Sequence, residues 1–592
     1  MPAGSNLTDI LVAQHQRDPQ RALYAVKRDG AWSDVSAAEL LAQVSAVAKG
    51  LMASGIAAGD TIAVMSKTRF EWTVVDLAGW FAGAVVVPIY ETSSPHQVQW
   101  ILQDSAAKLV FAEDAAKAAV VRQAMSGLPA ALPVWQLDGK ADGLAELEAR
   151  GTAVTDEELE VRRTSRGMQD AASLVYTSGT TGRARGCIIT HGNFAELAVN
   201  TVEFLADILK RPDAKSLMFL PLAHVLARAV QVICLTAGVK MGHTSSMAEL
   251  IEDLRTYQPT FLLVVPRVFE KVYATARQKA HDGGKGRIFD AAAQTAVAYS
   301  RARDAQARGT GPGPGLALKA RHAVFDRLVY AKLRAAFGGH VEYTVSGASA
   351  LNPKLAHFFT GIGVPVLEGY GLTESTAPAA VNLPGANRIG TVGLPLPGTT
   401  IRIADDGEVL IKGIGITRGY HNDDDANAEY FRDGFLCTGD VGSLDDDGYL
   451  TITGRKKELL VTAGGKNIAP GPLEDALREH RLVSQAVVVG EGRPFVGALV
   501  SLDEEGLAGW LASAGRAPVG LAEAAEDPAV LAELQQAVDQ ANQLVSRAEQ
   551  IRKFAVLGQD LTEASGHLTP SLKLKRVTVL EDFAGEIDSL YR

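Results

Sequence analysis

The sequence predicts an α/β fold, because short apolar runs rich in Val and Ile alternate with Ala-rich amphipathic stretches. The clearest apolar runs occupy residues 61–65, 84–89, 108–112 and 260–265. Such alternation is typical of parallel strands joined by crossover helices. The pattern changes twice toward the C-terminus. We therefore expect a large N-terminal domain of parallel and mixed sheets over 1–454, a β-rich subdomain within it at about 390–454, and a small C-terminal α/β domain over 455–592.

The longest apolar run spans residues 72–90 and approaches the length of a membrane-spanning helix. Asp76 lies inside the run and Pro88 lies near its end. We interpret the run as a helix of small residues at 77–83 followed by a buried strand at 84–89. The chain is therefore not expected to span a membrane.

A helical pattern extends from about 275 to 340, and a tract of Gly and Pro at 309–315 divides it. Neither residue type sustains a helix interior. The tract is therefore predicted to be a loop between two helices on the surface of the large domain.

Short strands separated by turns rich in Asp and Gly characterise the β-rich subdomain. These strands are expected at 401–404, 407–412 and 449–453. In the C-terminal domain, a stretch rich in Ala, Glu and Gln at 527–554 is predicted to form a long surface helix pair.

The composition is that of an ordinary globular protein, with 47% hydrophobic and 21% charged residues. A net charge of −10 argues against a nucleic-acid-binding protein, which needs a basic surface to displace counterions. Cys187, Cys234 and Cys437 are far apart and form no CxxC pair, so we expect no disulfide framework or structural zinc site and a cytoplasmic location. Residues 1–20 lack a basic segment followed by an apolar run, so no secretory signal peptide is expected.

A strand-like run that begins at residue 174 leads into a loop of small and hydroxylated residues. The loop consists of Thr177, Ser178, Gly179, Thr180, Thr181 and Gly182. Glycines let backbone amides approach a phosphate, hydroxyls add donors, and Arg183 and Arg185 supply positive charge. The spacing differs from that of a Walker A loop. A linker is the alternative for a Gly-rich turn alone, but this combination favours a nucleotide phosphate site.

This loop resembles the phosphate loop of the adenylate-forming superfamily, which includes acyl-CoA synthetases, luciferases and the adenylation domains of peptide synthetases. Ala184 and Arg185 stand where that family usually has Pro-Lys, so the positive charge is kept. The resemblance extends from about residue 20 to 580, with the motifs in the family's order. Within the superfamily, the segments 91–105, 266–273 and 275–340 are most similar to bacterial and actinobacterial long-chain fatty-acid–CoA ligases.

The segment 220–228 resembles the family motif that lies beside the acyl and phosphate groups. By this resemblance, His224 would be a catalytic residue that lines the active site, and Arg228 would gate a fatty-acid tunnel. Taken alone, His224 would more often be a core histidine bonded to a backbone carbonyl.

The segments 346–349 and 368–375 resemble the family's adenine-binding motifs. The resemblance implies an adenine slot in which the tyrosine stacks on the base; its residues would be Gly347, Gly369, Tyr370 and Gly371. It also implies that Thr373 contacts the α-phosphate as a catalytic residue, and that Glu374 and Thr177 hold Mg²⁺. A carboxylate suits Mg²⁺, which prefers hard oxygen ligands. The alternative for Glu374 taken alone is a solvated charge.

Two later segments resemble the ribose and hinge motifs of the family. Asp440 would accept both ribose hydroxyls, because the two oxygens of a carboxylate can take two donors, and Arg455 would contact the ribose. Lys457 falls at the hinge, while Gly464 and Gly465 match the loop that lines the pantetheine tunnel of coenzyme A. Without the flanking motifs, Lys457 would be interpreted equally well as a solvated charge, and Gly464 and Gly465 as a turn.

The closing motif of the family aligns with residues 568–576. By this alignment, Lys573 is the catalytic lysine that contacts the nucleotide, and Lys575 is its neighbour. A basic C-terminal strand is the alternative, above all for Lys575. The family also implies that the small domain is mobile and rotates about Lys457 between two reaction steps, which would withdraw Lys573 from the site.

The resemblance implies a long-chain fatty-acid–CoA ligase that uses ATP, Mg²⁺ and coenzyme A. The fatty-acid carboxylate would attack the α-phosphate of ATP to give an acyl-adenylate and pyrophosphate, and the thiol of coenzyme A would then displace AMP. Catalysis would consist of positioning and cationic stabilisation. An ionised carboxylate needs no general base, which agrees with the lack of a recognisable Ser-His-Asp pattern.

Two alternatives remain at the sequence level. A fatty-acyl-AMP ligase would hand its adenylate to a carrier protein, although the compact span from Glu374 to Asp440 favours a CoA ligase. A lipid-binding or scaffold protein with a decayed site is the second. A fatty acid partitions into bilayers, so peripheral contact with a membrane is compatible with this function, but no amphipathic anchor stands out in the sequence.

Overall fold

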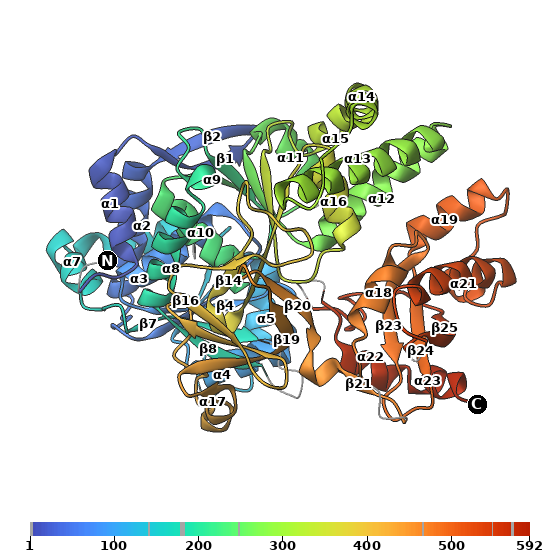
Figure 1. The fold of residues 1–592 in the computed structure, drawn as a ribbon. Helices are drawn as coiled ribbons and strands as arrows, with labels where there is room; N and C mark the ends of the chain where they lie inside the picture. The colour runs from blue at the N-terminus through green and yellow to red at the C-terminus, as the bar shows by residue number, and fades with distance from the viewer. Residues whose placement is uncertain are drawn as a thin grey trace.

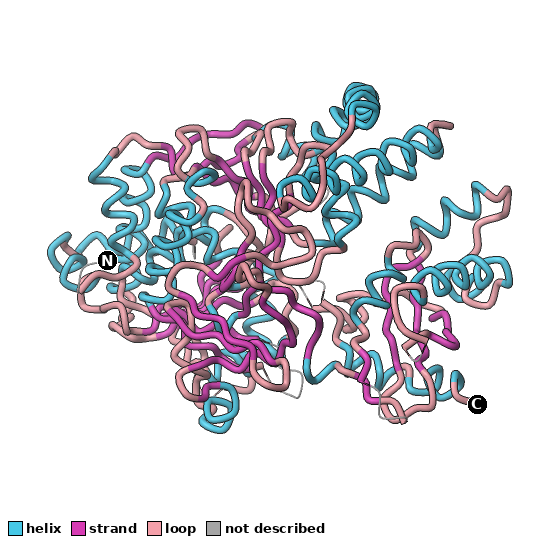
Figure 2. Tube along the Cα trace, in the orientation of Figure 1, coloured by secondary structure: helices cyan, strands magenta, loops and turns pink. Residues whose placement is uncertain are grey.

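The computed structural model describes residues 4–128, 130–139, 143–177, 184–246, 249–463, 467–547, 549–569 and 573–592. The described residues form a large N-terminal body and a smaller C-terminal unit, which lies at the right of Figure 1. Helices and strands alternate along most of the chain (Figure 2). The α/β architecture predicted from the sequence is confirmed.

The first large sheet has six strands in the order β6-β5-β3-β4-β7-β8. Its neighbouring strands are parallel except for the antiparallel pair β7 and β8. The strands are β3 (Thr61–Met65), β4 (Val85–Ile89), β5 (Leu109–Ala112), β6 (Val134–Gln136), β7 (Ala171–Thr177) and β8 (Arg185–Thr190). The three strands that the sequence predicted in this sheet are confirmed to within one residue.

The second large sheet has nine strands in the order β15-β14-β13-β12-β11-β9-β10-β1-β2, with a parallel centre and antiparallel pairs at both edges. The strands are β1 (Ala22–Arg28), β2 (Ala31–Ser36), β9 (Lys215–Met218), β10 (Lys240–His243), β11 (Phe261–Val264), β12 (Tyr343–Ser346), β13 (Val366–Leu372), β14 (Ala377–Val381) and β15 (Leu394–Pro395). β11 confirms the strand predicted at 260–265.

Both large sheets are covered by helices on each face. Phe261 and Leu263 of β11 join one hydrophobic core, while Leu262 and Val264 join another, because successive strand residues point to opposite faces. The first core also contains residues of β3, so it lies between the two sheets. Its helices are α1 (Thr8–Arg17), α2 (Ala37–Ala53), α3 (Phe70–Phe81), α6 (Leu144–Arg150), α7 (Asp156–Arg163), α8 (His191–Phe204), α9 (Ala206–Leu209) and α10 (Val225–Ala237).

Two outer helical layers complete the large body. On the six-stranded sheet the outer helices are α4 (Pro95–Asp104) and α5 (Ala115–Met125). On the nine-stranded sheet they are α11 (Leu250–Tyr257), α12 (Pro266–Asp282), α13 (Gly286–Ala307) and α16 (Pro353–Gly361). The large body is thus a stack of helix, sheet, helix, sheet and helix layers.

The apolar run at 72–90 forms part of the core. Its helix, α3, begins at Phe70, seven residues before the predicted start, and β4 follows it. The Asp76 carboxylate inside this helix is fully buried and pairs with Arg228. In the part of the chain that the structure describes, no helix combines the length and the apolar character needed to cross a bilayer.

The predicted loop at 309–315 is confirmed, since α13 ends at Ala307 and α14 (Leu316–Phe325) begins after it. A π-helical turn, η2 (Asp326–Tyr330), joins α14 to α15 (Ala331–Ala336). α14 lies at the outer edge of the molecule, at the top of Figure 1.

A five-stranded antiparallel sheet follows the nine-stranded sheet. Its strands are β16 (Thr399–Ile403), β17 (Glu408–Gly413), β18 (Phe431–Arg432), β19 (Phe435–Leu444) and β20 (Leu450–Arg455), and α17 (Asp424–Tyr430) precedes β18. The three predicted β-rich strands are confirmed with shifts of one or two residues. The sheet packs through Val409 and Ile411 against Ala379 and Ala380 of β14.

The C-terminal unit is built on the sheet β23-β24-β25, whose two faces are covered by separate cores. The strands are β23 (Val483–Val489), β24 (Val496–Leu502) and β25 (Ile551–Leu557). One face carries α18 (Gly471–Arg478), α19 (Glu504–Ser513) and α21 (Pro528–Asn542), and the other carries α22 (Arg576–Asp582) and α23 (Ala584–Leu590). The smaller pieces β21 (Leu460–Val461) and β22 (Asn467–Ile468) precede them.

The helix pair predicted at 527–554 is wrong. One helix, α21, ends at Asn542, and the chain returns as strand β25. The Asn542 side chain accepts from the Ile551 amide (2.8 Å) and donates to its carbonyl (2.9 Å), which fixes the reversal. β25 then pairs in parallel with β24 and buries Ile551 and Leu557, a long-range gain that local composition does not reveal.

Candidate active site

A cavity of about 1620 Å³ lies where the large body meets the C-terminal unit. The carboxyl ends of β7, β12 and β13 reach it through Thr177, Gly347 and Thr373. This is the usual ligand position in α/β proteins, outside the carboxyl ends of parallel strands. The five-stranded sheet and the C-terminal unit close the cavity through Asp440 and Lys573.

The cavity wall brings together the predicted site residues that the structure describes, apart from Arg228. They are Thr177, His224, Gly347, Gly369, Tyr370, Gly371, Thr373, Glu374, Asp440, Arg455, Lys457 and Lys573. Seven residues predicted for the phosphate loop or the coenzyme A tunnel lie outside the described residues: Ser178, Gly179, Thr180, Thr181, Gly182, Gly464 and Gly465.

Asp440 is the centre of a hydrogen-bonded group on one side of the cavity. Its carboxylate is nearly buried, with 4% exposure. The Tyr370 hydroxyl donates to Oδ2 (2.6 Å), and Arg455 Nε lies 3.0 Å from Oδ1. A carboxylate has about four lone-pair sites, so each oxygen keeps one site for a further donor such as a ribose hydroxyl. The two partners fix the orientation in which Asp440 would receive it.

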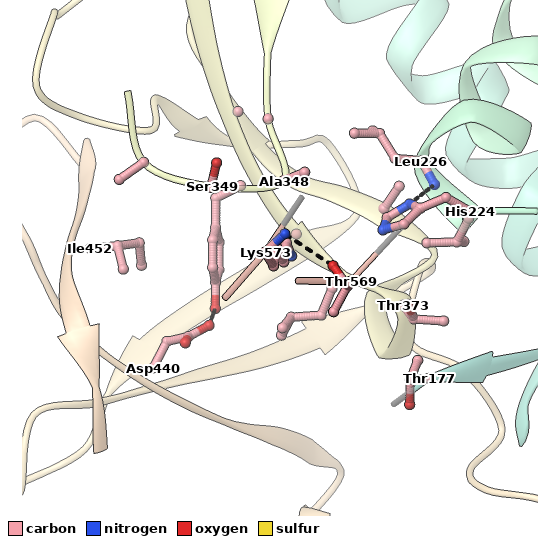
Figure 3. A pocket seen from close by; sticks show the side chains of 18 of the residues that line it. Thr177, His224, Leu226, Ala348, Ser349, Thr373, Asp440, Ile452, Thr569 and Lys573 are labelled. Carbon is pink, nitrogen blue, oxygen red and sulfur yellow. Dashed lines mark hydrogen bonds between the residues drawn. The ribbon is translucent and has the colours of Figure 1, made fainter. Parts of the chain in front are cut away.

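Lys573 extends from the C-terminal unit into the middle of the cavity. Figure 3 shows it between Asp440 on one side and His224 and Thr373 on the other. The Lys573 amide donates to Thr569 Oγ1 (3.0 Å) and its carbonyl accepts from the Thr569 amide (2.8 Å), which fixes its backbone. Burial, with the nearby Arg455 guanidinium, lowers the pKa of Lys573 to about 8. An anionic ligand would oppose that shift.

His224 stands at the start of α10 and faces the cavity. Its Nδ1 accepts a hydrogen bond from the Leu226 amide (3.1 Å), so the side chain caps the helix. Burial, reinforced by the charge of Lys573, lowers the pKa of His224 to about 4. The imidazole is therefore neutral at pH 7, and with Nδ1 accepting, Nε2 carries the proton. The residue offers one N–H donor to a ligand.

Glu374 is the carboxylate of the cavity that the family resemblance predicts to be a magnesium ligand. Its Oε1 accepts from the Tyr420 hydroxyl (2.7 Å), and both Tyr420 and Thr177 line the cavity. Mg²⁺ in nucleotide sites is bound by one or two carboxylates together with phosphate oxygens. An oriented carboxylate in the same cavity wall as the Thr177 hydroxyl therefore fits that ion. Tyr420 belongs to no predicted motif, and only its contact with Glu374 reveals its role.

Gly371 shows why the adenine segment requires glycine. A Cβ at this position would lie 1.8 Å from the Ala377 carbonyl oxygen. The register of β13 and β14 shifts at this point, so the two backbones approach more closely than a side chain permits. Ser346, at the end of the neighbouring β12, has a buried hydroxyl that faces the same cavity and has no partner among the described residues. That hydroxyl is available to a ligand.

The prediction that Arg228 gates a fatty-acid tunnel is not supported, because its side chain does not reach the cavity wall. Arg228 is completely buried in the first core. Its guanidinium binds both oxygens of Asp76 (2.5 and 3.1 Å) and donates to Ser173 Oγ (2.5 Å). Trp72 also packs on the guanidinium, at 5.5 Å from the ring centre. Its hydrogen-bonding capacity is directed at the core.

The sequence analysis implied a fatty-acid tunnel but did not identify the residues that line the apolar arm of the cavity. The arm extends from His224 between helices of the middle layer and the nine-stranded sheet. It is lined by Thr201, Leu205, Ile208, Leu209, Val225, Leu226, Val230, Ile233, Cys234, Phe261 and Leu263. These residues come from α8, α9, α10 and β11, so no local pattern marks them as a group. The arm can bury an aliphatic chain whose polar end lies at His224.

Glu368 lies in an adenine-binding motif, but the sequence analysis predicted no role for it. Its side chain lines the cavity with 8% exposure. Burial raises the pKa of Glu368 to about 7, against hydrogen bonds from the backbone of Leu351 and Gly390. The side chain therefore ties two loops of the cavity wall to β13.

Two family descriptions cover most of the chain. The AMP-binding enzyme family matches residues 11–421, and the AMP-binding enzyme C-terminal domain matches residues 457–592. This chain belongs to the AMP-binding enzyme family. The relatives of this chain include the long-chain-fatty-acid–CoA ligase FadD15 of Mycobacterium bovis. The two sequences are 47% identical over 584 residues, which cover 98% of this chain and 96% of FadD15. The long-chain-fatty-acid–CoA ligase ACSBG1 of Bos taurus is 28% identical, over 96% of this chain and 82% of its own.

Solved structures agree with this AMP-binding fold. The A-PCP didomain of carboxylic acid reductase from Segniliparus rugosus, in complex with AMP, superposes with a TM-score of 0.77 at 22% identity, over all of this chain and 82% of its own. The o-succinylbenzoate coenzyme A synthetase of Bacillus subtilis, in complex with ATP and magnesium ion, has a TM-score of 0.67 at 20% identity, over 96% and 98%. At these identities the likeness establishes the fold.

Proposed function

We propose that this AMP-binding enzyme is a long-chain fatty-acid–CoA ligase, which activates a fatty acid with ATP and transfers it to coenzyme A. The observation that carries the proposal is the continuity of the cavity. A polar chamber lined by Asp440, Thr373 and Lys573 leads directly into an apolar arm. The arm suits a long alkyl chain, since each buried methylene contributes about 0.8 kcal/mol.

In the first step, the fatty-acid carboxylate attacks the α-phosphate of ATP, and pyrophosphate leaves. Lys573 places a cation where negative charge builds up, and Thr373 supplies a hydroxyl beside it. His224, neutral and protonated on Nε2, donates to a carboxylate or phosphoryl oxygen at the mouth of the apolar arm. Asp440 and Arg455 hold the ribose, and Tyr370 lies against the base. Positioning of the two substrates supplies the remainder of the rate.

Glu374 and Thr177 would hold Mg²⁺ in this site, together with phosphate oxygens of the nucleotide. When bound, the ion neutralises phosphate charge and supports the departure of pyrophosphate. Tyr420 keeps the Glu374 carboxylate oriented through its 2.7 Å hydrogen bond.

In the second step, the thiol of coenzyme A attacks the acyl carbonyl and AMP leaves. We assign the hinge to Lys457, whose ammonium lies 3.0 Å from the Tyr430 hydroxyl and 3.4 Å from Glu429. These exposed contacts are weak enough to break during a rotation. The domain boundary at 454 and 455, and the role of Gly464 and Gly465 in the thiol tunnel, are parts of this proposal.

Free coenzyme A distinguishes this function from that of a fatty-acyl-AMP ligase. Purified protein with ATP, magnesium and palmitate is expected to release AMP rapidly only when coenzyme A is present, and to yield palmitoyl-CoA. Adenylate that accumulates regardless of coenzyme A would favour transfer to a carrier protein. The absence of pyrophosphate release with any fatty acid would contradict both enzymatic functions.

A further inference from the structure

The segment from α14 to α15 carries an apolar stripe on the outside of the molecule. Neither α14 nor α15 has a buried residue. Leu316 is 85% exposed, and Val324 and Leu328 are each 56% exposed. These residues and the exposed Ala320 follow one another at intervals of four, which places them along one face of a helix.

The π-helical turn η2 aligns this stripe. In a regular α-helix, residues four apart drift by about 40° around the axis, so Leu328 would turn away from Leu316. In the wider turn at Asp326–Tyr330, each residue rotates by a smaller angle around the helix axis, which reverses that drift. It also breaks the 3.6-residue period, and for this reason the stripe does not stand out as an amphipathic helix in the sequence.

The opposite face of the segment is fastened to the large body. His322 Nε2 lies 2.7 Å from the Gly361 carbonyl oxygen, and its ring stacks on Tyr299 at 3.9 Å. The Tyr330 hydroxyl donates to the Ala292 carbonyl (2.7 Å), and Arg334 donates to the Ile362 carbonyl (2.7 Å). These contacts hold the segment on α13 and α16 with its apolar stripe directed outward.

Positive charge surrounds the stripe. Residues 286–336 contain nine Lys and Arg and three Asp, a net charge of +6 in a chain whose total is −10. Four of these cations lie on α14, η2 and α15 with exposed side chains: Lys319, Arg321, Arg327 and Lys332. The surface formed by Leu316, Val324, Leu328 and these four cations is called the α14 surface below.

We propose that the α14 surface binds the headgroup region of a bilayer that contains anionic lipids. An apolar stripe flanked by Lys and Arg is the arrangement with which a helix lies in the plane of a membrane interface. The long basic side chains reach lipid phosphates while their methylene stems extend the apolar surface. The rest of the chain is acidic, so the segment 286–336 determines which side of the protein faces the membrane.

Membrane binding is measured directly by co-sedimentation of the full-length protein with vesicles, without nucleotide or coenzyme A. Vesicles of phosphatidylcholine with about 30% phosphatidylglycerol are compared with pure phosphatidylcholine at low salt and at about 0.5 M salt. Binding is expected only to the anionic vesicles, and it should weaken as salt screens the charges. Because this readout needs no turnover, it is independent of the proposed ligase activity.

Two variants separate the contributions of charge and apolar surface. Lys319→Glu with Arg327→Glu should weaken binding to anionic vesicles by at least about tenfold. Its matched control is Lys108→Glu with Arg122→Glu, which makes the same change in net charge at exposed positions just before β5 and on α5. Leu316→Ser with Val324→Ser should reduce the binding that remains at high salt, and the control Val161→Ser changes a residue that is 72% exposed on α7.

The proposal is overturned if the wild-type protein ignores anionic vesicles at low salt, or if the α14 variants bind as the controls do. Failure to bind any vesicle, together with a specific protein that is retained through Leu316 and Val324, would assign the surface to a protein partner. Equal melting temperatures of the variants and wild type exclude misfolding as the cause of lost binding.

Discussion

The Lys354 ammonium lies 2.9 Å from Glu479 Oε2, and this pair joins the large body to the C-terminal unit. The Asn352 amide also donates to the same carboxylate, at 2.5 Å from Oε1. Asn352 caps α16, and Glu479 ends α18. The contact exists in the arrangement that places Lys573 in the cavity. In the proposed mechanism, it therefore stabilises the form of the enzyme that is competent for adenylate formation.

Glu479→Ala is expected to slow adenylate formation by about twofold to fivefold, because an exposed pair contributes up to about 1 kcal/mol. Transfer of the acyl group from preformed acyl-adenylate to coenzyme A should be unchanged or faster. ATP–pyrophosphate exchange and single-turnover thioester formation measure the two steps. Glu526→Ala, at an exposed glutamate of the same unit, is the control. An equal slowing of both steps in Glu479→Ala would contradict a role of this contact in stabilising the adenylate-forming arrangement.

Lys573→Ala is expected to lower adenylate formation by at least about a hundredfold, because the buried cation that meets the developing phosphoryl charge is lost. Thioester formation from preformed palmitoyl-AMP should persist, since the proposed rotation about Lys457 withdraws the lysine in that step. The two half-reactions are measured as above. Lys575→Ala, two residues further on, should retain most of the activity, and a comparable loss there would assign the effect to local folding.

The pH dependence of the first step follows from the lowered pKa of Lys573. With a pKa of about 8, the ammonium is protonated at pH 7 and loses its charge as the pH rises through 8. The kcat/KM of adenylate formation, which reports the free enzyme, should therefore decline above about pH 8. Lys573→Arg should be slower but should lose this decline, because a guanidinium stays protonated. A wild-type profile that is flat to about pH 9.5 would contradict the assignment.

The apolar arm is expected to set the accepted chain length. Cys234 lines the arm from α10, and Cys234→Trp would fill part of it. Each methylene that no longer fits costs about 0.8 kcal/mol, or about fourfold in kcat/KM. Palmitate should therefore lose activity far more than octanoate. The control is Val199→Trp, at a residue of α8 that is 37% exposed. A uniform loss of activity across chain lengths would contradict the assignment of the arm as the acyl site.

The buried pair of Arg228 and Asp76 is expected to act on stability. Arg228→Met leaves an unpaired carboxylate in the core and should lower the free energy of unfolding by about 3–5 kcal/mol. Asp76→Leu combined with Arg228→Met removes both charges and should recover much of this loss. Thermal or urea unfolding measures both variants. If Arg228→Met is as stable as the wild type but changes the chain-length preference, this result would support the gate function that the sequence analysis predicted for Arg228.

Much of this protein could be predicted from local patterns. The strand at 61–65 was exact, because a short buried run of β-branched residues has few alternatives. The resemblance to the adenylate-forming superfamily predicted Lys573, Asp440 and Glu374 as site residues, and the structure brings their segments to one cavity. Residues 551–557 were misassigned because their strand exists only through pairing with β24.

The sequence by itself determined most of the succession of strands and helices and the motifs from which a nucleotide site is predicted, because both depend on short stretches of chain. Tertiary structure alone decided which side chains share a surface. It turned Arg228 toward Asp76, 152 residues away, and assembled the apolar arm from four separate elements. It also placed Leu316 and Leu328 on one outward face through a π-helical turn. Such relationships arise from packing between distant segments, which no local periodicity encodes.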